Sequence, residues 1–366
     1  MKTKKLFLSG PLSLLLFLVI SCANNEAPFP SLSTTIASTT TSTTTSTTGT
    51  TVPLQFSAYI TDLSKIAYIT PIGSIGTHPD GAEFKSHSFF RITDEVTTVE
   101  VYSPVSAEVV EMKYLINRAD NVPEYYLLFQ INDNLFFYFD HLIDVNAEIK
   151  SFRPDEPTDD STVSFYPPSP IAIQAGELIG STEGTLQAHN WDFGAYDTST
   201  TPAQINPARF YGQTSRLYGI CPYQYYPESM KEQYLNLFAD SFGTIIPGAS
   251  CGSVSQDVAD TAAGAWFLDS GTDSTYKAKF VIAKTITDNI QWGGVGSGVL
   301  VDRQTDTYTP IDPAEITAGE SASYQDYERE NYLFIKLLSA TELGIIYGSG
   351  ETPAVFPETG YKTYLR

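Results

Sequence analysis

The chain has 366 residues, with 21 lysines and arginines against 42 aspartates and glutamates, which gives a formal net charge of −21. An acidic chain without a basic block is not suited to hold a nucleic-acid backbone, so nucleic acid is excluded as a partner. Charged residues make up only 17% of the chain and hydrophobic residues 42%, which excludes a charge-rich disordered protein.

Residues 1–21 are predicted to be a signal peptide. Three lysines precede a short apolar run at residues 12–20, and the run ends at Ser21-Cys22. This arrangement resembles a bacterial lipoprotein signal, which implies cleavage before Cys22 and membrane anchoring through its lipidated thiol. Because Ala23 follows the cysteine, the resemblance also implies the outer membrane of the cell envelope. The alternative is an ordinary secretory signal that ends by chance at a cysteine.

Residues 22–52 are predicted to form a disordered tether. From residue 31 onward the segment consists almost entirely of serine, threonine and glycine. Such a composition has little apolar surface to bury and therefore forms no packed core. The tether would let the folded part of the protein stand away from the membrane.

The remainder is predicted to be mainly β, with two domains at residues 53–200 and 201–366. Alternating apolar and polar residues predict strands at 97–102, 107–112, 125–131, 135–139, 276–285, 298–303, 332–338 and 343–347. Residues 171–179 predict a pair of strands broken at Gly176. Residues 227–242 predict one helix, because Pro227 suits a first turn and Met230, Tyr234 and Phe238 share one face. The second domain is expected to be a sandwich or barrel of unknown role.

Cys221 and Cys251 are the remaining cysteines, and they are predicted to form a disulfide. Export places them in an oxidising compartment, where paired cysteines are the usual state. The alternative is two free buried thiols.

All four histidines lie before the predicted domain boundary: His78, His87, His141 and His189. The order of several segments is informative, above all a Tyr-Phe-Asp-His-Leu run ending at Leu142 and an Ala-Gly-Glu-Leu-Ile-Gly-Ser-Thr run ending at Thr182. In this order, residues 74–197 resemble the lysostaphin-like (LytM-type) zinc metallopeptidases of the cell wall. The resemblance implies a β-sheet domain built from duplicated hybrid motifs.

The resemblance also implies the members of a zinc site. His87 stands where the first ligand is expected, and Asp192 replaces the last histidine of a His-x-His strand. His141 matches the histidine that assists the attacking water. Arg91 stands where the family has an aspartate ligand, and a cation cannot bind zinc. His78 is therefore the candidate for the missing ligand.

Two functions remain open from the sequence. The first is an envelope lipoprotein with a degenerate metallopeptidase-like domain that binds peptidoglycan or envelope proteins without cutting them. The second is an active zinc-dependent peptidoglycan endopeptidase with a variant metal site. Convergence of His87, His141 and Asp192 on one point would favour the enzyme, whereas an ion pair of Arg91 filling that point would favour the degenerate domain.

Overall fold

The computed structural model describes residues 54–366 except 79–80, 117–121, 154–162, 211, 241, 269–279, 295–298 and 306–307. The predicted signal peptide, Cys22 and the tether lie outside the described residues. The described chain is mainly β, as predicted, with antiparallel sheets and a few short helices. Within it, no helix is both long enough and apolar enough to cross a membrane.

The elements of the described chain follow one another as short strands with tight connections. The strands are β1 (Ile66–Thr70), β2 (Ile75–His78), β3 (Gly81–Phe84), β4 (His87–Ile92), β5 (Val99–Tyr102), β6 (Ala107–Ile116), β7 (Pro123–Gln130), β8 (Leu135–Leu142), β9 (Asp144–Val145), β10 (Val163–Phe165), β11 (Ile171–Ile173), β12 (Leu178–Thr182), β13 (Asn190–Asp197), β14 (Gly219–Ile220), β15 (Gly264–Trp266), β16 (Phe280–Lys284), β17 (Ile290–Gly293), β18 (Leu300–Asp302), β19 (Ser321–Gln325), β20 (Asn331–Ser339), β21 (Glu342–Ser349) and β22 (Lys362–Leu365). The α-helices are α1 (Ala147–Ser151), α2 (Thr214–Tyr218) and α3 (Glu228–Leu235), and the 3-10 turns are η1 (Leu63–Lys65), η2 (Pro207–Phe210), η3 (Pro222–Tyr225) and η4 (Pro313–Glu315).

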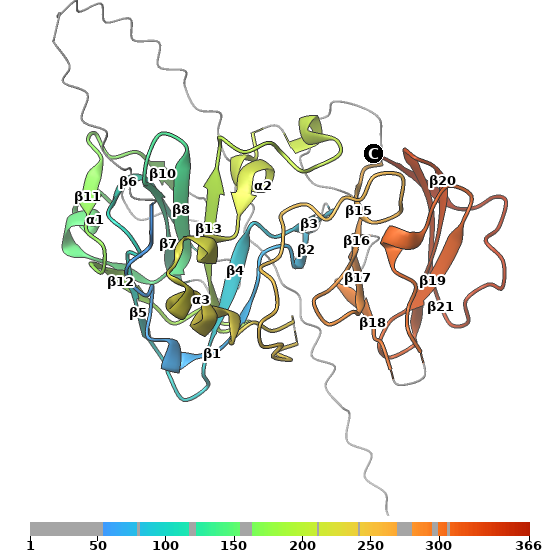
Figure 1. The fold of residues 1–366 in the computed structure, drawn as a ribbon, viewed down its shortest axis with the longest axis horizontal. Helices are drawn as coiled ribbons and strands as arrows, with labels where there is room; N and C mark the ends of the chain where they lie inside the picture. The colour runs from blue at the N-terminus through green and yellow to red at the C-terminus, as the bar shows by residue number, and fades with distance from the viewer. Residues whose placement is uncertain are drawn as a thin grey trace, which may run out of the picture.

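A large antiparallel sheet dominates the first part of the described chain (Figure 1). Its strand order is β1-β4-β13-β8-β7-β6-β10, with β11 also paired to β6 and β14 paired to β13. A smaller sheet of order β5-β12-β9 accompanies it. The central strands β4, β13 and β8 lie side by side, so residues far apart in sequence are brought into neighbouring rows.

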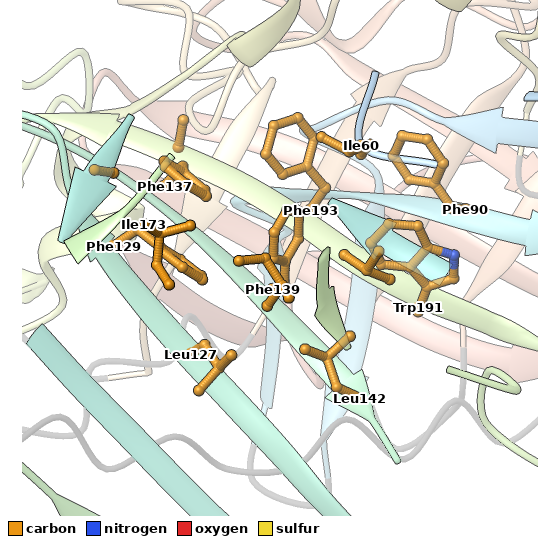
Figure 2. Close-up of a cluster of buried hydrophobic side chains, with 14 of the residues drawn as sticks. Ile60, Phe90, Leu127, Phe129, Phe137, Phe139, Leu142, Ile173, Trp191 and Phe193 are labelled. Atoms are coloured by element: carbon orange, nitrogen blue, oxygen red, sulfur yellow. The ribbon is translucent and has the colours of Figure 1, made fainter. Parts of the chain in front are cut away.

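Alternation along the central strands separates a hydrophobic core from a polar face. On β13, Trp191 and Phe193 point into the core together with Phe90, Phe137 and Phe139 (Figure 2). The intervening residues Asp192 and Gly194 necessarily point to the opposite face, because successive strand side chains alternate. The polar face is nevertheless largely buried, since Asp140 and Asp192 are 6% and 3% exposed.

Most of the predicted strands and the predicted helix are present in the structure. The pair of strands expected within 171–179 forms as β11 and β12, and Gly176, where the break was expected, has a φ of +77°. The helix expected at 227–242 forms as α3 and is shorter than predicted.

The segment after the expected domain boundary packs on the first core. Tyr223, Tyr226, Tyr234 and Phe238 are buried in the same cluster as the large sheet. In the opposite direction, the β2–β3 hairpin packs against β16 and β17 of the second part. The division at residue 200 stays a prediction. Residues after it pack on the core of the large sheet, and a hairpin before it packs on the later strands.

The strands between residues 264 and 365, called the second part below, form two four-stranded antiparallel sheets, β15-β16-β17-β18 and β19-β20-β21-β22. A shared core lies between them, with Trp266, Trp292 and Tyr324 among its buried residues. This pairing of two sheets around one core agrees with the sandwich that the sequence predicted as one of two options.

Candidate functional site

Two rows of side chains cross the polar face of the large sheet. In the first row, Gly194 of β13 lies directly between His87 of β4 and Tyr138 of β8. A Cβ on Gly194 would lie 2.2 Å from Cζ of Tyr138, so glycine is what allows the tyrosine ring to cross the strand. The Tyr138 hydroxyl consequently reaches Nδ1 of His87 at 3.4 Å.

The second row carries the acidic groups. Asp192 of β13 lies directly opposite Asp140 of β8. Oδ2 of Asp192 is 3.2 Å from Nε2 of His87 and 3.7 Å from Nε2 of His141. Two imidazoles from two strands therefore converge on one carboxylate oxygen supplied by the strand between them.

Three neighbouring residues contact His141 through its ring and its backbone. Its Nδ1 lies 2.7 Å from Oε2 of Glu124, at the start of β7. Its backbone N–H donates to Oδ1 of Asp140 at 2.8 Å, and its carbonyl accepts from the Thr182 hydroxyl at 2.5 Å. The backbone at His141 has a φ of +65°, an uncommon conformation for a residue other than glycine. These contacts hold the ring in one orientation in spite of the unfavourable backbone.

Two buried polar atoms of the cluster have no hydrogen-bond partner in the part of the chain that the structure describes. Oδ1 of Asp192 is buried and has no hydrogen-bond partner among the described residues. Nε2 of His87 is also buried, and its approach to Asp192 is too poorly aligned to be a hydrogen bond. Unsatisfied buried polar atoms are uncommon in folded proteins, and an unseen water or ion is one explanation for them.

The donor set also suits a metal ion. One ligand atom each from Asp140, His141 and Asp192 lies within 4.8 Å of the others. Imidazole nitrogens and carboxylate oxygens are the common protein ligands of zinc apart from cysteine. In addition, Nδ1 of His141 is held by Glu124 and Nδ1 of His87 faces Tyr138. Such outer contacts are typical of metal-binding histidines.

Burial and neighbouring charges shift the pKa values of the cluster in different directions. Burial, aided by the Lys85 ammonium, lowers the pKa of His87 well below 6.5. Burial opposes protonation of His141 as well, but the surrounding carboxylates, first Asp140 and then Glu124, raise its pKa well above 6.5. Burial raises the pKa of Asp192 to about 7 in spite of the nearby His141. His141 is therefore the favoured proton carrier of the cluster at neutral pH.

The structure brings together three of the predicted site residues, His87, His141 and Asp192. Arg91 does not fill the point where they meet: its Nη2 lies 2.8 Å from Asp94, and its Nη1 donates to the His189 carbonyl at 3.3 Å. His78 ends β2 at the tip of a hairpin, and its side chain lies outside the described residues. Its role as a ligand stays a prediction.

Several members of the cluster were not predicted from the sequence. Glu124, Tyr138 and Asp140 lie on the same polar face, and the alternation of β7 and β8 is the signal that could have identified them. Glu83 and Lys85 precede His87 by four and two residues and are 5% and 2% exposed. They form a buried ion pair at 2.8 Å, and Glu83 also pairs with Arg216 of α2.

Comparison with known proteins gives one structural match. No family model matches the chain, and no curated protein matches it in sequence. A chain in the structure of the SpoIIQ–SpoIIIAH pore-forming complex aligns with 48% of this chain and 96% of its own length, at 12% identity and a TM-score of 0.30. No argument about function is drawn from an alignment of that quality.

The pKa shifts of the cluster predict that the free energy of unfolding falls above neutral pH. The raised pKa of His141 means that its stabilising contribution is complete below about pH 6.5, the unfolded value, and is lost as pH rises through the folded value. Asp192 acts in the same direction between 3.8 and about 7, whereas the lowered pKa of His87 acts in the opposite direction below 6.5. The charged groups that act on His141 and Asp192 are Glu124 of β7, Asp140 of β8 and Lys85, and the neutral ring of His87 lies beside Asp192. Lys113 of β6 acts on Asp140.

We therefore expect the free energy of unfolding to fall between pH 7 and pH 9, with a slope of at most about 1.4 kcal/mol per pH unit for one proton. Urea unfolding in a metal chelator measures this, and His141→Gln should flatten the profile. A parent profile that is level or rising over this window would contradict the assignment of the proton to His141.

Proposed function

We propose that this protein is a lipid-anchored protein of the bacterial cell envelope whose metallopeptidase-like β domain binds peptidoglycan without cutting it. The observation that carries the proposal is the protonation of His141, whose ring lies between carboxylates. Its Nδ1 lies 2.7 Å from Oε2 of Glu124, and its Nε2 faces Oδ2 of Asp192 at 3.7 Å. Burial opposes protonation, but Asp140 and Glu124 raise the pKa of His141 well above 6.5. An imidazolium has no unprotonated ring nitrogen that could take a proton from an attacking water or bind a metal ion.

The surroundings of His87 support the same reading. Lys85 and Arg216 lie in the buried region beside this histidine and share the Glu83 carboxylate, so the three groups together leave one net positive charge there. Positive charge near a prospective metal site disfavours a divalent cation. Arg91, at the position where the resemblance requires an aspartate ligand, is paired with Asp94 instead.

A second candidate function is a zinc-dependent peptidoglycan endopeptidase. It is favoured by the convergence of His87 and His141 on Asp192 and by the buried Asp192 Oδ1 that lacks a hydrogen bond. Asp140, His141 and Asp192 would hold the ion. His87 lies beside them, with its Nε2 3.2 Å from Oδ2 of Asp192. A zinc ion bound there would lower the pKa of a bound water to about 7. Glu124 and Tyr138 would orient the two imidazoles by their contacts with Nδ1.

The two functions are separated by incubating the protein with purified peptidoglycan sacculi, with and without added zinc. We expect the protein to sediment with the sacculi and to release no soluble muropeptides in either condition. A matched pair of variants, His87→Ala in the cluster and His189→Ala outside it, shows whether any effect belongs to the site.

Two other outcomes of this experiment would contradict the proposal. Failure to sediment with sacculi would rule out binding to the wall. Zinc-dependent release of muropeptides, with about one zinc per chain that is lost in His87→Ala and kept in His189→Ala, would establish the endopeptidase instead.

A further inference from the structure

A polar cavity in the second part of the chain lies far in sequence from the histidine cluster. Its volume is about 610 Å³, and its wall includes Asp302 at the end of β18, Tyr308, Gln325 of β19, Arg329 and Glu351. The strands that frame it are the β18, β19 and β21 region at the end of the molecule away from the large sheet (Figure 1). The cavity is large enough to hold a small organic ligand.

Asp302 is the fixed element of this cavity. The residue is only 5% exposed, and its Oδ2 accepts hydrogen bonds from the Tyr308 hydroxyl at 2.7 Å and from the backbone N–H of Gln325 at 3.2 Å. These two contacts fix the plane of the carboxylate. Among the described residues, none donates to Oδ1, which leaves one oriented acceptor for a ligand.

The remaining polar groups of the cavity offer donors and acceptors together. Arg329 can only donate, Glu351 can only accept, and the Gln325 amide can do both. A hydroxyl group also donates and accepts, so a neutral ligand with several adjacent hydroxyls can satisfy such a mixture. A strongly charged ligand would meet a group of its own sign, because the cavity wall carries both signs of charge.

An aromatic pair, Tyr327 and Phe242, is linked to the cavity through the turn that carries Tyr327, because Tyr327 lies between the lining residues Gln325 and Arg329 in the chain. The guanidinium of Arg303, the residue after Asp302, lies 4.4 Å from the ring centre of Phe242 and 4.2 Å from that of Tyr327. The two side chains are 54% and 62% exposed in spite of this contact. The contact with Arg303 orients both rings while leaving their outer faces accessible.

Both rings are carried on turns that an aspartate holds rigid. Oδ1 of Asp240 accepts from the backbone N–H groups of Phe242 and Thr244, each at 2.9 Å. Asp326 accepts in the same way from the N–H groups of Glu330 and Asn331, at 2.8 and 3.1 Å. A preorganised platform loses little conformational entropy when a flat apolar face stacks on it.

We propose that this cavity and the adjoining rings form a binding site for a neutral oligosaccharide. The polar cavity would take the hydroxyls of one sugar unit, with Asp302 Oδ1 as its oriented acceptor. The exposed rings of Tyr327 and Phe242 would stack on the apolar faces of neighbouring units. The proposal does not depend on the histidine cluster or on the function proposed for it.

The test is isothermal titration of the whole protein with three defined tetrasaccharides: cellotetraose, maltotetraose and the tetramer of N-acetylglucosamine. We expect at least one to bind, and Tyr327→Ala to weaken that binding by about fivefold through loss of a stacking surface. Asp302→Asn is expected to weaken it by about tenfold or more, because it replaces a charged acceptor. Tyr166→Ala removes a comparably exposed tyrosine, 52% exposed, that lies next to β10, and should bind as the parent does.

Tyr327 is an exposed turn residue, so its replacement leaves the fold intact, and thermal unfolding of each variant verifies this. Absence of binding to all three sugars at millimolar concentration would overturn the proposal. Equal binding by the parent and Tyr327→Ala would overturn it as well. Calcium binding that is lost in Asp302→Asn, without any sugar binding, would identify the cavity as a cation site instead.

Discussion

Replacement of Glu83 by glutamine is expected to lower the free energy of unfolding by about 3–5 kcal/mol, the range measured when one partner of a buried ion pair is removed. Glu83 lies on β3 and is 5% exposed. Its Oε1 is 2.8 Å from Nζ of Lys85, which is itself 2% exposed, and its Oε2 pairs with Arg216 of α2. The substitution keeps the size of the side chain but leaves two enclosed cations without the carboxylate they share.

Lys85 cannot relieve this imbalance by moving into solvent. Its chain runs over Gly76, where a Cβ would lie only 2.1 Å from Cε of Lys85. Removal of the lysine itself should be milder, because in Lys85→Met the carboxylate of Glu83 keeps its contact with Arg216. Urea unfolding of the parent, Glu83→Gln and Lys85→Met measures the difference. A Glu83→Gln protein within about 1 kcal/mol of the parent would show that this pair is not desolvated in the way its burial indicates.

The sequence alone predicts those parts of the fold whose signals are local. Alternation marks β5, where buried and exposed residues take turns along the strand. In contrast, β7 and β8 are buried on both faces, and their runs of aromatic and aliphatic residues are what indicate strands. The break between β11 and β12 is visible from Gly176, because glycine readily adopts the positive φ found there. Helix α3 was visible from the spacing of Tyr234 and the residues around it, although only eight residues adopt the helix.

The composition of the site was only partly visible from the sequence. The resemblance singled out His87, His141 and Asp192, which the structure brings together. The resemblance did not identify Arg216 as a member of the site. Arg216 pairs with Glu83, more than 130 residues away in the sequence, and no local sequence pattern predicts such a contact. The resemblance also did not predict the left-handed backbone conformation of His141. That conformation is held by the contacts of His141 with Asp140, Thr182 and Glu124.

The histidine cluster also explains why an acidic pair is tolerated inside the sheet. Asp140 and Asp192 lie directly opposite each other on neighbouring strands, an arrangement that destabilises a sheet when both are ionised. Burial raises the pKa of both carboxyl groups, and His141 supplies a positive charge to both. The acidic pair and the histidine therefore stabilise one another, and the loss of His141 would leave two carboxylates to share one proton.

Removal of the disulfide between Cys221 and Cys251 is the second change expected to have a large effect. The predicted bond is present, with a Cα–Cα distance of 5.8 Å and a sequence separation of 30 residues. A loop of that size corresponds to roughly 3–4 kcal/mol of stabilisation in the chain-entropy description. We expect the double variant Cys221→Ser with Cys251→Ser to lose about that amount in urea unfolding, with Ser250→Ala as the matched control beside the bond.

The native structure of the loop should survive this change, since other contacts hold the enclosed segment on the large sheet. The Tyr234 hydroxyl accepts from the N–H of Ile60 at 3.1 Å, and Ile69 exchanges backbone hydrogen bonds with Leu237 and Ala239, each at 2.8 Å. Phe238 is fully buried in the same core. The loss should therefore arise mainly in the unfolded chain, which becomes more extended without the bond, so the urea dependence of the unfolding free energy should steepen. If the double variant instead lost its native near-ultraviolet circular dichroism before any urea was added, the bond would be required to dock the segment as well as to restrict the unfolded state.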